Sequence, residues 1–126
     1  MNCDMIILDY QNRYPIYQQV IAQIERYISL GLLKEGDSLP SIRELANHLG
    51  INPNTVKKAY DELESKGFIV SVSTKGCFVS HEISKVRENR VSQEFEKIKE
   101  SMEELIQIGY DKNQLSEKLT AMIESL

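Results

Sequence analysis

Residues 52–58 of this chain concentrate side chains that can form hydrogen bonds and ion pairs. Amide and hydroxyl groups can donate to and accept from the edges of nucleic-acid bases, whereas ammonium groups bind phosphates. A guanidinium precedes this stretch and another ammonium follows it, and both can contact the same kind of polyanion. The side chains in question are Arg43, Asn52, Asn54, Thr55, Lys57, Lys58 and Lys75. Their chemistry is typical of a surface that binds nucleic acid.

Bond-breaking chemistry has little support in the sequence. The chain has two histidines, His48 and His81, and it lacks a glycine-rich phosphate loop, a nucleophile elbow and a zinc-protease motif. Its two cysteines, Cys3 and Cys77, are too few for a disulfide scaffold and are not spaced as metal ligands. The sequence therefore predicts a protein that is not an enzyme and that has no cofactor and no metal site.

Two short helices are predicted to position the polar side chains. Ser41 followed by Glu44 is a capping box, apolar residues then recur at helical spacing, and Gly50 provides the C-terminal stop. Asn52 and Pro53 begin a second helix, because asparagine caps the free amides and proline needs no hydrogen-bond partner in the first turn. A connection this short predicts a helix-turn-helix.

The charges of the second helix run against the helix dipole. Lys57 and Lys58 lie in its first turns and the acids Asp61, Glu62 and Glu64 come later, whereas the dipole favours the reverse order. This order suits a helix whose N-terminal end enters the major groove of DNA. An ordinary solvated amphipathic helix is the alternative interpretation, since surface charges have little effect on stability.

A β-hairpin is predicted directly after this helix. Residues 68–73 and 77–80 are β-prone and are separated by Thr74, Lys75 and Gly76. Gly76 allows a positive φ in the turn. A hairpin in this place is a wing, whose tip can lie along the DNA backbone, and Lys75 is the only charge at the tip.

The run LPSIRELANHLGINPNTVKKAYDELESKGFIVSVSTKGCFVS resembles the winged-helix domain of the GntR superfamily of bacterial transcription regulators, and its NPNTV segment and short tail resemble the YtrA subfamily. The resemblance spans residues 10–80. It implies a mainly α fold with a small β-hairpin (α+β), an N-terminal winged helix-turn-helix over residues 1–80 and a helical dimerisation tail over residues 81–126. The implied DNA contacts are Arg43, Asn52, Asn54, Thr55, Lys57, Thr74, Lys75 and Gly76.

The chain departs from the family pattern in its recognition helix. Many GntR members have arginine where this chain has Pro53, and often where it has Lys57. Arginine gives a bidentate readout of guanine that neither proline nor lysine reproduces. The operator sequence is therefore not transferable from other branches. We expect Arg43 to contact a guanine or a phosphate, Asn54 and Thr55 to contact base edges, and Lys57, Lys58 and Lys75 to contact phosphates. Asn52 is either a DNA contact or only an N-cap.

The tail is predicted to form two helices with unpartnered apolar stripes. A long helix from about Ser84 to Ile108 is followed by a break at Gly109 and a second helix that Asp111 caps. A hairpin this small cannot enclose both stripes, so the same hairpin of a second subunit is predicted to cover them in a four-helix interface. Folding back onto the winged domain is the alternative. The stripe residues are Val91, Phe95, Ile98, Met102, Leu105, Leu115, Leu119, Met122, Ile123 and Leu126.

Together these features predict a sequence-specific DNA-binding transcription regulator, a homodimeric repressor that binds double-stranded DNA at an inverted-repeat operator. The resemblance to the YtrA subfamily implies control of a transporter operon. A winged helix that binds protein instead of DNA is the alternative, and the net charge of −4, from 15 basic and 19 acidic residues, favours it. The same charge predicts weak non-specific binding to DNA. The first nine residues lack the pattern of a signal peptide and no segment is long and apolar enough to span a membrane, so a cytoplasmic location is expected.

Overall fold

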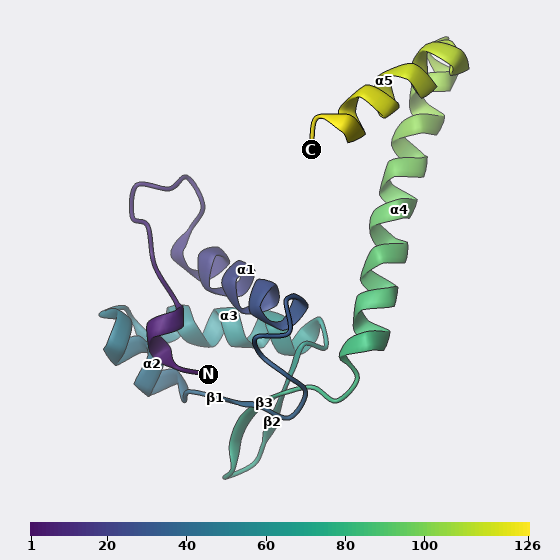
Figure 1. The fold of residues 1–126 in the computed structure, drawn as a ribbon. Helices are drawn as coiled ribbons and strands as arrows, with labels where there is room; N and C mark the ends of the chain where they lie inside the picture. Colours follow the sequence, from purple (N-terminus) through teal and green to yellow (C-terminus); the bar gives the residue numbers. More distant parts are fainter. The chain divides into compact units, whose positions relative to one another are not determined.

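Three helices and a small sheet form the N-terminal unit of the chain in the computed structural model, which describes residues 1–126 (Figure 1). Two compact units are present, Met1–Val86 and Arg87–Leu126, whereas the sequence divided the chain after residue 80. The elements of the first unit are η1 (Cys3–Met5), α1 (Ile16–Ser29), β1 (Ser38–Leu39), α2 (Ile42–Leu49), α3 (Pro53–Ser65), β2 (Ile69–Val72) and β3 (Gly76–Val79). The predicted fold class, mainly α with a small β part, is confirmed.

The ends of α2 and α3 follow the predicted capping signals. The Ser41 Oγ accepts a hydrogen bond from the Glu44 amide at 3.1 Å, and α2 ends at Gly50, whose φ is +67°. The Asn52 Oδ1 accepts from the Asn54 amide at 2.8 Å, and Pro53 is the first residue of α3. Each signal acts within three residues, which is why it could be predicted from the sequence.

A single apolar core joins the three helices to the sheet. Helix α3 packs against both α1 and α2, and its own C-terminal end leads into the sheet. Full burial of each such side chain stabilises the fold by about 1.5–3 kcal/mol. The largest fully buried side chains are Val20, Ile24, Leu45, Val56, Leu63, Ile69 and Val79.

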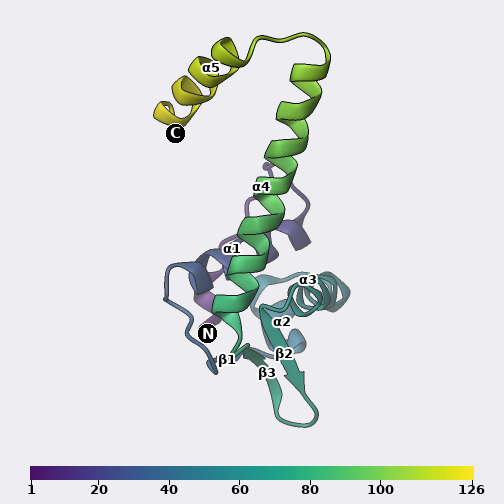
Figure 2. The same cartoon turned by 90° about the vertical axis from the view of Figure 1, so that its right-hand side faces the viewer.

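The sheet contains the predicted hairpin and one further strand. Strands β2 and β3 pair antiparallel, with Ile69 opposite Val79 and Val72 opposite Gly76, and the hairpin extends away from the helices (Figure 2). The short β1 adds to the other side of β3, so the strand order is β1-β3-β2. Strand β1 is not predictable from the sequence, because two residues carry no periodic pattern and the pairing is long-range.

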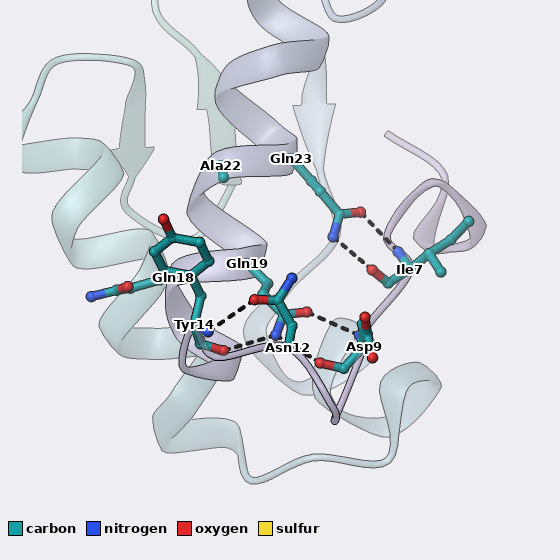
Figure 3. Close-up of a pocket in the computed structure, with 8 residues that line it drawn as sticks. All are labelled: Ile7, Asp9, Asn12, Tyr14, Gln18, Gln19, Ala22 and Gln23. Atoms are coloured by element: carbon teal, nitrogen blue, oxygen red, sulfur yellow. Dashed lines mark hydrogen bonds between the residues drawn. The ribbon is translucent and has the colours of Figure 1, made fainter.

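An extended N-terminal segment, residues 6–9, lies along α1 and is held there by two glutamines (Figure 3). The amide of Gln23 accepts from the Ile7 nitrogen at 2.9 Å and donates to the Ile7 oxygen at 2.6 Å. Gln19 is bonded in the same way to both backbone groups of Asp9 and also donates to the Tyr14 oxygen. These bonds give an irregular segment the partners that a strand would otherwise find in a sheet.

Two helices, α4 (Ile83–Gln107) and α5 (Lys112–Glu124), make up the tail, and α4 begins within the first unit. Helix α4 begins and ends within one residue of its predicted bounds. Helix α5 begins directly after its predicted cap, Asp111. Gly109 has a φ of +92° between them, and the Asp111 Oδ2 accepts from the Gln114 amide at 3.1 Å. None of the helices combines the length and the apolarity that a membrane crossing requires.

Candidate nucleic-acid interface

Helix α3 has one buried and one exposed face. Its buried side chains are Val56, Ala59, Tyr60 and Leu63, which recur at helical spacing and face the core. The opposite face is exposed. It carries the predicted contact residues Asn54, Lys57 and Lys58 together with Asp61, all of them exposed.

The buried Tyr60 fixes α3 against the start of α2. Its hydroxyl donates to the Pro40 carbonyl at 2.8 Å, and the residue is 5% exposed. Burial raises the pKa of Tyr60 far above its ordinary value, so the hydroxyl stays protonated and keeps donating. Because Pro40 precedes Ser41, the N-cap of α2, this bond links α3 to the start of the helix whose first turn carries Arg43. Nothing in the sequence indicates this bond, because its two partners are twenty residues apart.

Both lysines of α3 have partners within the free chain. The Lys57 Nζ lies 2.7 Å from the Asp61 Oδ2, one helical turn further along α3. The Lys58 Nζ lies 3.8 Å from the centre of the Tyr17 ring, which α1 presents. Both ammonium groups were expected to contact phosphates, and neither partner was predicted from the sequence.

The polar start of α3 combines capping with exposure. The cap uses the side-chain oxygen Oδ1 of Asn52, so the side-chain nitrogen Nδ2 is the atom that can donate to a ligand. Asn54 is exposed and Thr55 is half-buried on the same first turn. Arg43 is exposed on the first turn of α2.

The wing is tied to α3 through Glu64. Its Oε1 accepts from the Ser71 amide at 3.1 Å and its Oε2 accepts from the Ser71 hydroxyl at 3.2 Å. Ser71 belongs to β2, which is an edge strand, so the carboxylate also occupies backbone that the sheet leaves unpaired. From the sequence, Glu64 was only one of the acids late in the helix, and its contact with the wing was not predicted.

The turn of the wing has positive φ at two positions. Gly76 has a φ of +109°, as predicted, and Thr74 has a φ of +64°, which is uncommon for a β-branched residue. Lys75 lies exposed between them, and its amide donates to the Val72 oxygen at 3.0 Å. The nine predicted contact residues therefore come from the first turn of α2, the N-terminal half of α3 and the wing tip, all within the first unit.

No group of three histidine, cysteine, aspartate or glutamate side chains is arranged to hold a metal ion. Both cysteines are free and half-buried. Burial raises the pKa of the Cys3 thiol and, likewise, that of the Cys77 thiol. Both thiols therefore stay protonated and are weak nucleophiles at neutral pH.

Residues 16–79 match the family model described as "Bacterial regulatory proteins, gntR family". The chain is 40% identical to the HTH-type transcriptional repressor YtrA of Bacillus subtilis over 102 residues, which are 81% of this chain and 76% of that protein. The structure of YtrA from Sulfolobus acidocaldarius, a GntR-family transcription factor, is similar with a TM-score of 0.59 and 42% identity, over 71% of this chain and 95% of that one.

A similar structure also contains DNA. The DNA-binding domain of AraR in complex with operator ORE1 matches with a TM-score of 0.51 and 31% identity, over 59% of this chain and 90% of that one. These relatives are transcription regulators and not enzymes.

Proposed function

This chain belongs to the gntR family of bacterial regulatory proteins, and from that premise we propose that it is a homodimeric repressor of transcription that binds an inverted-repeat operator. It is a DNA-binding transcription regulator by family. Repression, the dimer and the form of the operator are our inferences. The exposed polar face of α3, held between the Arg43 turn and the wing, is the observation that carries the proposal.

The DNA contacts divide by chemistry. We assign Asn54 and Thr55 to base edges, because their side chains both donate and accept on the first turn of α3. Arg43 contacts a guanine or a phosphate, and Asn52 donates through its amide nitrogen. Phosphates are assigned to Lys57, Lys58 and Lys75, and the backbone around Lys75 is assigned to Thr74 and Gly76.

The apolar side chains of the tail support the dimer. On α4, Phe95 is 65% exposed and Ile98 is 47% exposed, and on α5 Ile123 is 68% exposed. Leu115 is the one buried residue of α5, and α4 has none. Large exposed apolar side chains that recur at helical spacing support an interaction site. We propose that the tail of a second copy covers the stripes formed by Val91, Phe95, Ile98, Met102, Leu105, Leu119, Met122 and Ile123, beside Leu115, which is already buried within the single chain.

A two-fold dimer determines the form of the operator. Two recognition helices related by a two-fold axis read two half-sites in opposite directions, so the operator is an inverted repeat. In helix-turn-helix dimers the half-sites lie about 34–36 Å apart, or a multiple of that distance. The similarity to YtrA leads us to propose a transporter operon as the target, which sequencing of DNA bound in cells tests directly.

An electrophoretic mobility shift tests DNA recognition. Duplex DNA from upstream of the protein's own coding sequence is mixed with micromolar dimer at low salt, with a scrambled duplex as control. We expect a shift with the upstream DNA that the scrambled duplex does not compete away. No shift at low salt would refute the repressor and leave the winged helix as a protein-binding module.

Sedimentation tests the dimer with charge-matched variants. Phe95→Glu places a carboxylate within the α4 stripe, whereas Gln93→Glu adds the same charge outside it. We expect Phe95→Glu to sediment as a folded monomer that binds an inverted repeat poorly, because the second half-site is no longer linked to the first. Gln93→Glu should sediment as a dimer. A dimer in both variants would move the interface to another surface.

A further inference from the structure

An acidic side chain lies within the face of α3 that is proposed to meet DNA. Asp61 follows Asn54 by seven residues, so both lie on the same side of the helix two turns apart. The Lys57 ammonium is bonded to its carboxylate at 2.7 Å, and both side chains are 61% exposed. Carboxylates repel phosphates, so this position is unusual for a surface that binds a polyanion.

The other acids of α3 have different places. Glu64 is bonded to Ser71 of the wing through both oxygens. Glu62 is half-buried and follows Asp61 by one residue, which places it about 100° further around the helix. Asp61 is therefore the acid of α3 that pairs with a predicted DNA contact.

Helix stability does not account for this pair. An exposed pair one turn apart contributes little to stability, and the order of lysine before acid is the weaker of the two orders in a helix. The neighbouring Lys58 also has a partner, because its ammonium group lies over the Tyr17 ring. The arrangement keeps both ammonium groups of the recognition helix occupied in the free chain.

We propose that Asp61 is a specificity-determining residue, which holds Lys57 on non-specific DNA and releases it on the operator. This proposal rests on the proposed function of α3 as the DNA-reading helix. To bind a phosphate of non-specific DNA, Lys57 would exchange the Asp61 carboxylate for another anion and leave that carboxylate close to the DNA. Such a contact would release few counterions and gain little, so Lys57 stays with Asp61. On the operator, hydrogen bonds from the first turn of α3 to base edges compensate for the separation of the pair.

Asp61→Asn tests this proposal, because it removes the charge and keeps the shape. Glu62→Gln is the matched control, since it makes the same change of charge one residue further along, away from Lys57. The probes are the duplex that the wild-type protein selects from a random-sequence library and a scrambled version of that duplex. Fluorescence anisotropy at a series of salt concentrations gives the affinity and the salt slope for each.

We expect Asp61→Asn to bind the scrambled duplex several-fold more tightly, with a salt slope steeper by about one unit, because Lys57 then exchanges a solution counterion for a phosphate. The selected duplex gains less, so the ratio of the two affinities falls. Glu62→Gln should change both affinities by the same small factor. Both variants should melt at the wild-type temperature.

Three results would separate the possible failures. Equal effects of Asp61→Asn and Glu62→Gln on the two affinities would overturn the inference, because Asp61 would then act only through the net charge of the chain. A lost preference at one base pair, with unchanged affinity for the scrambled duplex, would also overturn it and make Asp61 a reader of bases. If the wild-type protein selects no sequence from the library, the proposed function itself fails.

Discussion

Gly67 connects the recognition helix to the wing, and replacing it with alanine should destabilise the N-terminal unit. Its φ is +86°, and its amide donates to the Glu64 carbonyl at the end of α3. A Cβ at this position would lie 2.9 Å from the Cγ2 of Val86, which packs partly buried against the core. Gly67→Ala therefore introduces both backbone strain and a steric clash.

A second glycine separates these two effects. Gly31 has a φ of +76°, but a Cβ there would have no atom within 4 Å. A left-handed conformation costs an L-residue about 1–2 kcal/mol, and alanine regains about 0.4–1 kcal/mol by restricting the unfolded chain. Gly31→Ala should thus lower the free energy of unfolding by about 1 kcal/mol. Gly67→Ala should lower the free energy of unfolding by about 1–3 kcal/mol more than Gly31→Ala does, which is the usual effect of overpacking.

Thermal and urea denaturation followed by circular dichroism measure the difference. In a unit of this size each kcal/mol shifts Tm by roughly 4–8 °C, so Gly67→Ala should melt well below Gly31→Ala. Val86→Ala removes the clashing methyl groups, and the double variant should be more stable than the sum of the two single effects predicts. Equal losses in the two glycine variants, or additive effects at Gly67 and Val86, would refute the clash.

The remaining predictions concern DNA binding and use the duplexes described above. Arg43→Ala should abolish the preference at one base pair or lower the affinity strongly, and an unchanged binding profile would remove this residue from the interface. Lys75→Ala should weaken all duplexes about equally and reduce the salt slope by about one unit, whereas an altered base preference would mean that the wing reads sequence. Glu64→Ala should loosen the wing, so it should lower affinity only while Lys75 is present. If the losses of affinity from Glu64→Ala and Lys75→Ala are additive in the variant that carries both, Glu64 does not act through the wing.

Local signals in the sequence predicted the helix-turn-helix. The caps at Ser41, Asn52 and Asp111 each bond an amide two or three residues away, and Gly50 has the left-handed conformation expected of a helix terminator. Such bonds depend on the nearest neighbours alone, so a single sequence is enough to find them. The hairpin was found for the same reason, because its turn follows directly from one strand and leads to the next.

Contacts between distant residues were not predictable in the same way. The pairing of Ser38 with Phe78 creates β1, and the Gln23 side chain holds Ile7 across sixteen positions of sequence. Neither residue type indicates its partner, since a glutamine on the surface of a helix is ordinary. The same is true of the candidate site. Lys58 was predicted as a phosphate contact, and nothing in the sequence indicated that its ammonium group would lie over the Tyr17 ring.

The partners of the two lysines, one local and one distant in sequence, change what the net charge implies about DNA binding. The sequence offers Arg43, Lys57, Lys58 and Lys75 as a cationic cluster, yet in the structure one lysine is bonded to Asp61 and another lies over an aromatic ring. A phosphate competes with these partners for the ammonium groups, and this competition offsets part of the gain from counterion release. On the proposed operator, hydrogen bonds to matching bases compensate for the competition. An acidic chain can therefore bind its operator and still bind other DNA weakly.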